Sequence, residues 1–496
     1  MPEPTHETCH QLLTRRRAGI LLHITSLPGP GAVGDLGSQA YRFVDFLVSS
    51  GMSVWQILPI GPTMHDSSPY QSSSMYAGNP RLISLEMPKQ KGWLEATTEA
   101  TETLSDQTKA DSIRQAWKGF KRRASKVDQA DFQRFTAEQG WWLEDYALFQ
   151  ALSTEEKRCW WDWRKALRDR EPQALAMSRS RLKQLIEVTR FEQYLFYIQW
   201  MHLKRYANER GVLLFGDVPI FVAHDSAEVW AHREFFDLLE DGHPRVVAGV
   251  PPDYFSETGQ RWGNPLYKWD VMEADGFSFW INRLKVQSTL FDFLRIDHFR
   301  GFEAYWEIPA TEETAMKGCW IKAPGERLFA RLYEALPHLE LVAEDLGIIT
   351  PEVEAMRKAH QLPGMKILQF AFSGGPGNPY LPFHHTRDSV VYTGTHDNDT
   401  TLGWYTSLDD TVRELVDDYL GCSREVMPWP LIRCALASRA NLAVIPMQDA
   451  LGLDGTHRMN TPGTTQGNWS WRFRWEDIEP DTVERLLHRV SLYGRR

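Results

Sequence analysis

Four acidic residues follow short apolar runs in the sequence, and residues in such positions can act together. They are Asp217 in FGDVPI, Asp297 in LRIDHFRG, Glu344 in LVAEDLG and Asp397 in YTGTHDN. In a parallel β/α barrel, the residues at the carboxyl ends of the strands and in the loops after them converge on one mouth of the barrel. We therefore expect these four side chains to share one site.

A cluster of carboxylates is unfavourable unless something offsets the repulsion between their charges. Each ionised carboxylate raises the pKa of its neighbours. Arg295 lies two residues before Asp297, on the same face of its strand, where it can oppose this effect. One acid near a strand end could cap a helix or form a salt bridge, but four acids on four separate strands favour a catalytic site.

An ionised carboxylate beside a protonated one suits the cleavage of glycosidic bonds. One carboxylate attacks the anomeric carbon, and the second gives a proton to the departing oxygen. A third can hold the sugar hydroxyls while an oxocarbenium-like state forms. The four acids therefore predict an enzyme that acts on carbohydrate.

Two histidines leave a metal site open as an alternative, because His298 follows Asp297 and His396 precedes Asp397. Neither histidine belongs to an H-E-x-x-H motif, and adjacent residues on a strand point to opposite faces. The pattern favours a site without a metal, in which His396 donates a hydrogen bond to a sugar hydroxyl. His298 could equally be packed in the wall of the barrel.

The glycines at positions 29, 31 and 34 form a G-x-G-x-x-G pattern after an apolar run, which is where a dinucleotide fingerprint would lie. The next apolar run ends in LPIG, with no acid to bind a ribose hydroxyl, and Gly37 delays the start of the helix. We interpret the stretch as a plain loop. No cofactor is demanded by the chemistry.

Eight short apolar runs, each followed by polar or glycine-rich residues, predict the strands that position these side chains. They span residues 19–25, 53–59, 212–218, 291–297, 339–345, 365–372, 390–396 and 441–447. Helical patterns between several of them imply right-handed crossovers and a parallel sheet. Such a sheet is covered on both faces, which explains why the runs are continuously hydrophobic. The pattern predicts an α/β fold, a (β/α)8 TIM barrel.

The spacing of the runs is uneven, which predicts large insertions on the C-terminal face of one catalytic domain spanning residues 1–496. Residues 88–190 are charged and carry helical patterns, so we expect a mostly helical subdomain there. Residues 245–267 are rich in glycine, proline and aromatic residues, and we expect them to form a mobile flap at the active site. We expect no separate C-terminal β-domain.

The composition excludes several other classes of protein. The 55 Lys and Arg residues against 65 Asp and Glu give a net charge of −10 with no dense basic stripe, so nucleic acid is not expected as a partner. No stretch approaches the about 20 apolar residues of a membrane-spanning helix. The five cysteines are odd in number and widely spaced, which favours reduced thiols and a cytoplasmic location. The oligomeric state is left open.

Along nearly its whole length, the sequence resembles the 4-α-glucanotransferases of glycoside hydrolase family 77, which are relatives of the α-amylases. These enzymes are also called amylomaltases or disproportionating enzymes. The stretches that carry the resemblance are, in order, HITSLPGPGAVGDLG, SPYQSSSMYAGNP, GDVPIFVAHDSAEVW, PPDYFSETGQRWGNPLY, LRIDHFRGFEAYWEIPA, AEDLGIITPEV, THDNDTTLGWY and MNTPGTTQGNWSWRF.

The resemblance implies a role for each of the predicted carboxylates. Asp297 would be the nucleophile, Glu344 the general acid and base, and Asp397 the stabiliser of the transition state. Asp217 would bind sugar in the donor site. Arg295 would help to orient the carboxylates.

Further residues would bind the glucan if the resemblance holds. His396 would help to orient the carboxylates, Tyr70 would stack on a sugar at the donor or an acceptor position, and Asn468 would contact the donor sugar. A flexible loop arches over the glucan in this family. The residues on the matching stretch are Tyr254, Phe255, Gln260 and Trp262.

The resemblance implies that an α-1,4-glucan segment is transferred to the 4-hydroxyl of glucose or of a maltooligosaccharide. The mechanism would be retaining double displacement through a covalent glucanosyl-enzyme at Asp297, which needs the two carboxyl groups about 5 to 5.5 Å apart. Two alternatives remain open. One is an α-amylase-like hydrolase, and the other is a glucan-binding protein that has lost catalysis.

Overall fold

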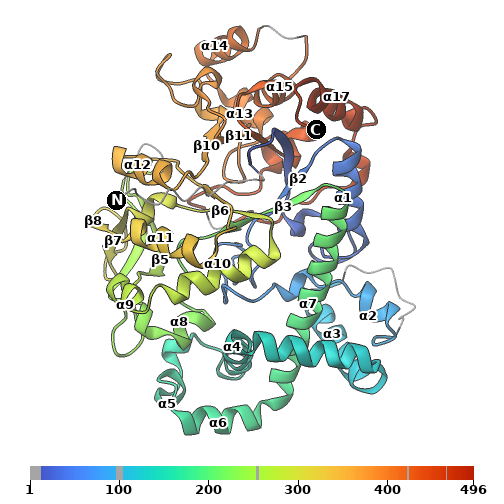
Figure 1. Cartoon of the computed structure of the whole chain (residues 1–496), viewed down its shortest axis with the longest axis vertical. Coiled ribbons are helices and arrows are strands. Elements are labelled where there is room, and N and C mark those ends of the chain that lie inside the picture. The colour runs from blue at the N-terminus through green and yellow to red at the C-terminus, as the bar shows by residue number, and fades with distance from the viewer. Residues whose placement is uncertain (1–12, 96–103, 253–255, 422–423, 465) are drawn as a thin grey trace, which may run out of the picture.

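The computed structural model describes residues 13–95, 104–252, 256–421, 424–464 and 466–496. Its centre is a sheet of eight parallel strands, β1 (Arg17–Leu21), β2 (Val54–Gln56), β3 (Leu213–Val218), β6 (Phe293–Ile296), β9 (Leu341–Ala343), β10 (Gly364–Ile367), β11 (Ser389–Tyr392) and β12 (Leu442–Pro446). The order in the sheet is β10-β11-β12-β1-β2-β3-β6-β9. The Ala343 N–H donates to the Pro363 carbonyl at 2.9 Å between the two end strands. The sheet therefore closes into the predicted (β/α)8 barrel (Figure 1).

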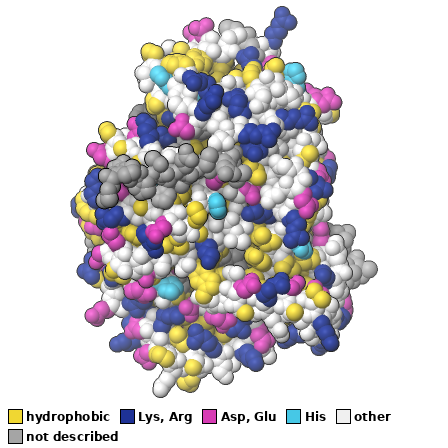
Figure 2. Space-filling model, in the orientation of Figure 1, with side chains coloured by type: hydrophobic (Ala, Val, Ile, Leu, Met, Phe, Trp, Pro, Cys, Tyr) yellow, Lys and Arg dark blue, Asp and Glu magenta, His cyan; other side chains and the backbone are white. Residues whose placement is uncertain are grey.

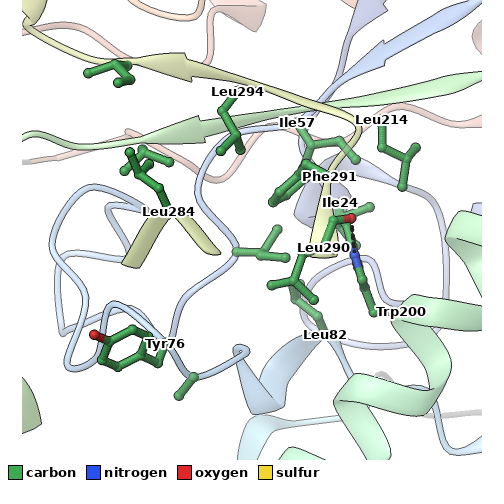
Figure 3. Packing of buried hydrophobic residues seen from close by; sticks show 14 of the residues in the cluster. Ile24, Ile57, Tyr76, Leu82, Trp200, Leu214, Leu284, Leu290, Phe291 and Leu294 are labelled. Carbon is green, nitrogen blue, oxygen red and sulfur yellow. Dashed lines mark hydrogen bonds between the residues drawn. The ribbon is translucent and has the colours of Figure 1, made fainter. Parts of the chain in front are cut away.

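The strands are buried on both faces, and neighbouring residues along a strand point to opposite sides. Phe215 of β3 and Phe293 of β6 belong to the apolar cluster inside the barrel, where their rings stack with centroids 4.2 Å apart. Their neighbours Leu214 and Leu294 belong to the outer cluster. Figure 3 shows this outer cluster, in which the indole N–H of Trp200 donates to the Leu290 carbonyl at 2.8 Å.

Helices follow the barrel strands along the chain. They are α1 (Ser38–Ser49), α7 (Lys183–Glu209), α8 (Ala227–Ala231), α9 (Trp269–Ala274), α10 (Ser278–Leu290), α11 (Gly325–Ala335), α12 (Pro351–Ala359), α13 (Thr401–Ser407), α14 (Asp410–Leu420), α15 (Trp429–Ala437) and α17 (Thr482–Leu492). In α1 the residues Phe43, Val44 and Leu47 are all buried. Their spacing of three and four residues gives the helix one apolar face, which packs against the core.

The longest connection joins β2 to β3 and contains the predicted helical segment. Its helices before α7 are α2 (Glu86–Gln90), α3 (Asp106–Arg123), α4 (Lys126–Glu156), α5 (Lys165–Arg168) and α6 (Pro172–Arg181). Figure 1 shows α4, α5 and α6 at one end of the molecule, away from the strands. The side chains of Ser105 and Ser125 cap α3 and α4 by accepting backbone N–H groups. The predicted boundary at residue 190 falls inside α7, which contains no proline or glycine to interrupt it.

A second, antiparallel sheet lies beside the barrel and corrects one prediction. Its strands are β4 (Val246–Val250), β5 (Gln260–Pro265), β7 (Ala304–Pro309) and β8 (Cys319–Lys322), in the order β5-β4-β7-β8. The prediction of loop structure over 245–267 is therefore wrong for β4 and β5. These strands form because β4 pairs with β7, which follows β6 in the chain, and because Val247 packs with Ile308 and Ala315. The local sequence does not reveal a partner so distant.

The described residues after β12 form α16 (Met447–Ala450), α17 and short turns, and none of them belongs to a strand. In the parts of the chain that the structure describes, no helix is long and apolar enough to cross a membrane. Cys159, Cys319 and Cys434 are free thiols, while Cys9 and Cys422 lie outside the described residues. On the face seen in Figure 2, basic and acidic side chains are interspersed.

Candidate active site

The barrel strands bring the predicted acids to one end of the barrel. Backbone pairing continues one residue beyond β6 and β9. There the Asp297 N–H donates to the Val218 carbonyl and the Glu344 N–H donates to the Ile296 carbonyl, each at 3.0 Å. Asp217 lies opposite Arg295 in the register of β3 with β6. The site therefore rests on three strands that are neighbours in the sheet.

Arg295 links two of these carboxylates from inside the barrel. Its Nη1 donates to both oxygens of Asp217, at 2.8 and 2.7 Å. Its Nη2 lies 2.8 Å from Oδ1 of Asp297. The side chains of Arg295 and Asp217 are 5% and 0% exposed, whereas that of Asp297 is 28% exposed. Asp217 and Arg295 thus form a buried ion pair, and Asp297 extends from it toward solvent.

The environments of Asp297 and Glu344 raise the pKa of both carboxyls above its usual value. Burial raises the pKa of Asp297, the Arg295 guanidinium lowers it, and the charges of Asp217 and Asp397 raise it again. Burial also raises the pKa of Glu344, and there too Arg295 acts in the opposite direction. With one fixed positive charge beside two carboxyls of raised pKa, one carboxyl can be ionised while the other keeps its proton.

The Glu344 carboxylate is held by the backbone. It accepts the His298 N–H at 2.7 Å and the Leu346 N–H at 2.8 Å, one on each oxygen. His298 adopts a left-handed conformation with φ of 51°. A non-glycine residue in this region costs about 1 kcal/mol or more. The strained turn after Asp297 thus supplies a hydrogen bond to Glu344.

Asp397 lies in the loop after β11 and stays accessible, with 46% of its side chain exposed. Its Oδ1 accepts a hydrogen bond from Nδ2 of Asn460 at 2.6 Å. Its Oδ2 lies 3.3 Å from Nε2 of His396, and its backbone carbonyl accepts from Arg458 at 3.0 Å. These contacts hold the carboxylate in place while leaving it open to a ligand.

Tyr70 and His396 connect this loop to Asp217. The Tyr70 hydroxyl donates to Oδ2 of Asp217 at 2.7 Å and lies 2.9 Å from Nε2 of His396. Because the hydroxyl has one proton, its bond to Asp217 requires Nε2 of His396 to be the donor to Tyr70. Burial lowers the pKa of His396, which favours the neutral ring. The two rings are stacked, with centroids 5.3 Å apart.

The structure gives different surroundings to the remaining predicted residues. The indole N–H of Trp262 donates to Gln260 at 3.2 Å, and its ring stands edge-on to His298 with centroids 4.8 Å apart. This brings both residues of β5 next to the turn after Asp297. Asn468 accepts the Thr461 N–H at 2.9 Å, so its amide closes a local loop. Tyr254 and Phe255 lie outside the described residues.

Sequence reasoning missed several residues of the site. Trp469 lies 6.0 Å from both the Tyr70 and the His396 ring centroids, and Asn460 and Arg458 contact Asp397. Only the stretch MNTPGTTQGNW, which begins one residue before Asn460, gave a signal for this region.

The alternative of a metal site finds no support in the side chains that the structure describes. Among them, no group of three or more His, Cys, Asp or Glu residues is arranged to hold a metal ion. The sequence HETCH at residues 6–10 matches the H-E-x-x-H pattern. These residues lie outside the described part of the chain.

Comparison with known proteins identifies the family. A family model described as 4-alpha-glucanotransferase matches residues 22–478. The chain belongs to the 4-alpha-glucanotransferase family. The resemblance inferred from the motifs is therefore confirmed.

Individual members of the 4-alpha-glucanotransferase family match over nearly their full length. The chain is 49% identical to a 4-alpha-glucanotransferase of Thermus thermophilus, covering 95% of this chain and 97% of the relative. It is 46% identical to one of Synechocystis, covering 98% and 99%. The amylomaltase of Streptococcus agalactiae, solved in complex with acarbose, matches with a TM-score of 0.94 and 37% identity over 97% of this chain and 100% of that structure.

Proposed function

We propose that this protein is a retaining 4-α-glucanotransferase, which moves a segment of an α-1,4-glucan to the 4-hydroxyl of glucose or of a maltooligosaccharide. One observation carries the proposal. Arg295 contacts both Asp217 and Asp297, beside a Glu344 carboxyl whose pKa burial raises. This arrangement suits an ionised nucleophile next to a proton donor, and family membership supports transfer between glucans as the reaction.

In the first step Asp297 acts as the nucleophile and Glu344 as the acid. A carboxylate oxygen of Asp297 attacks the anomeric carbon, and the bond from that carbon to the leaving oxygen breaks. Glu344 gives its proton to the leaving oxygen, so the released glucan ends in a neutral hydroxyl. Arg295 keeps Asp297 ionised through the charge contact at 2.8 Å.

In the second step the roles of Glu344 are reversed. The ionised Glu344 takes the proton of the acceptor's 4-hydroxyl, whose oxygen attacks the anomeric carbon and releases Asp297. The linkage is exchanged and no bond is lost overall. The backbone N–H groups of His298 and Leu346 steady the glutamate in its charged form.

Asp397 stabilises the positive charge that develops on the sugar in the transition state of each step. Its accessible carboxylate sits in contact with His396 and Asn460, where it can accept hydrogen bonds from the sugar hydroxyls. His396 also contacts Tyr70, so these two side chains bind sugar beside Asp217. Interactions of this kind favour the transition state when they tighten as charge develops.

Other residues bind the rest of the glucan. The Trp262 ring contacts His298, and its indole N–H donates to Gln260. In the proposed mechanism this aromatic ring shields the intermediate from water. The resemblance supports glucan contacts for Asn468, Tyr254 and Phe255. Exclusion of water favours a sugar acceptor over hydrolysis.

The organisation of the chain follows from this function. We infer one catalytic domain over residues 1–496, with 88–190 as a helical subdomain and 245–267 as a flap over the bound glucan. The strands β4 and β5 anchor both sides of this flap. We also propose a cytoplasmic location, which the three free thiols support.

Incubation with maltotriose tests the proposed reaction. Transfer produces glucose and a ladder of longer and shorter maltooligosaccharides, while the number of reducing ends stays constant. A steady gain of reducing ends would instead indicate an α-amylase-like hydrolase. Binding without any change in chain length would indicate an inert glucan-binding protein.

A further inference from the structure

A buried carboxylate outside the steps above lies at the end of the eighth barrel strand. Asp449 belongs to α16, directly after β12, and is 1% exposed. Its Oδ2 accepts the hydroxyls of Thr393 at 2.5 Å and Thr401 at 2.6 Å, and its Oδ1 accepts the Thr401 N–H at 2.7 Å. One carboxylate therefore satisfies three donors.

The two threonines mark the two ends of the loop that carries the proposed transition-state stabiliser. Thr393 directly follows β11, and Thr401 is the first residue of α13. His396 and Asp397 lie between them. Asp449 thus joins the start and the end of this loop to a neighbouring strand of the barrel.

Inside the loop, further polar contacts leave the backbone little freedom. Oδ1 of Asn398 accepts the Thr395 N–H and hydroxyl, both at 2.9 Å. Nε2 of Gln369 donates to the Asp399 carbonyl at 2.9 Å. The loop's position therefore depends on its ends, which Asp449 holds, and on the contacts of Asp397 with Asn460 and Arg458.

The hydrogen bonds to Asp449 are short and fix both threonines in place. Burial raises the pKa of Asp449, and the three hydrogen bonds from Thr393 and Thr401 act in the opposite direction. Hydrogen bonds to an ionised acceptor are shorter and about twice as strong as neutral ones. The contacts of 2.5 and 2.6 Å from the two hydroxyls match such an acceptor.

We propose that Asp449 is a positioning residue that sets Asp397 and His396 against the reacting sugar by fastening both ends of the loop 393–401. The proposal rests on the proposed role of Asp397. Asp449 does not touch substrate and acts only through the loop. Its removal lowers turnover without weakening the binding of the glucan in the ground state.

The principal variant is Asp449→Asn, measured with maltotriose. Its amide has one accepting oxygen in place of two, so the three hydrogen bonds to residue 449 cannot all be kept, and the loop shifts. A misplacement of about 1 Å lowers turnover by about 10²-fold. We therefore expect kcat to fall by about 10- to 100-fold, while KM changes by less than about threefold.

Matched pairs at the threonines separate positioning from general stability. Thr393→Val and Thr401→Val remove the hydroxyls with little change of shape, whereas Thr393→Ser and Thr401→Ser keep them. We expect the serine variants to retain turnover and the valine variants to lose it. If valine and serine variants have equal kcat, the proposal is wrong, whatever their melting temperatures.

A double-mutant cycle with Asp397→Asn tests whether the effect passes through the loop. Asp449→Asn should lower kcat far less in the Asp397→Asn background than in the wild type. Equal losses in both backgrounds would overturn the inference. If Asp397→Asn alone leaves turnover unchanged, the proposed role of Asp397 fails instead, so the two failures are distinguishable.

Discussion

Replacing Arg295 with Met removes the single positive charge that contacts both Asp217 and Asp297. The Asp217–Arg295 pair is buried, with both side chains 5% exposed or less. Breaking a buried pair by removing one partner costs about 3–5 kcal/mol. We therefore expect Arg295→Met to lower the midpoint of chemical unfolding clearly, and to lower kcat/KM by about 10²-fold as Asp297 loses its orientation.

The same substitution should move the pH profile in a defined direction. Arg295 lowers the pKa of both Asp297 and Glu344, so its loss raises both values. The acid limb of kcat/KM, where Asp297 must ionise, then moves to higher pH. The alkaline limb, where Glu344 must keep its proton, moves in the same direction. Activity is thus lost most strongly at the acid end of the range.

The assay is the disproportionation of maltotriose measured across pH, with Arg295→Lys as the control. Lysine keeps the charge but cannot span two carboxylates with one ammonium group. We expect it to restore the position of both limbs without restoring the full rate. A profile for Arg295→Met that overlies the wild type, or one displaced to lower pH, would refute the electrostatic role of Arg295.

Three further substitutions test the remaining roles. Glu344→Gln should slow transfer from maltotriose by about 10²- to 10⁴-fold. An α-maltotriosyl fluoride donor should recover formation of the covalent intermediate, because fluoride leaves without a proton. Equal losses of rate with both donors would contradict the role of Glu344 as the acid. Trp262→Ala should increase the ratio of reducing ends released to glucan transferred, and an unchanged ratio means that the ring does not exclude water. Tyr70→Phe removes the hydrogen bonds to Asp217 and His396. It should lower kcat/KM by about tenfold, from about 1–1.5 kcal/mol for a lost hydrogen bond. A loss below twofold would mean that these two hydrogen bonds do not position His396 for the reaction.

The barrel could be predicted from sequence because each strand carries its own signal. Even β2, which spans only Val54–Gln56, lies in a longer apolar run that ends at a proline. The acids at the strand ends followed from the same reasoning, because parallel strands bring their carboxyl ends to one side. Arg295 and Asp297 lie two residues apart on one strand, and their side chains are in contact at 2.8 Å, as the spacing predicts.

The parts that sequence reasoning missed depend on contacts between distant segments. The pairing of β4 with β7 and the contact of Asn460 with Asp397 join residues whose local sequence is typical of loops. Asp449 gave no signal either, because its role depends on two threonines that flank a loop on another strand. The hydrophobic periodicity of a sequence indicates which residues of one helix or strand are buried. It carries no information on which distant residues they contact.

Capture of the covalent intermediate tests the central claim most directly. The Glu344→Gln variant is incubated with α-maltotriosyl fluoride, which can form the intermediate although the variant lacks the base for its breakdown. The protein is then digested and its peptides are analysed by mass spectrometry. We predict a maltotriosyl ester on the peptide that contains Asp297, at the Asp297 side chain. An ester on any other residue, or fluoride release with no adduct and inverted product, would contradict the account.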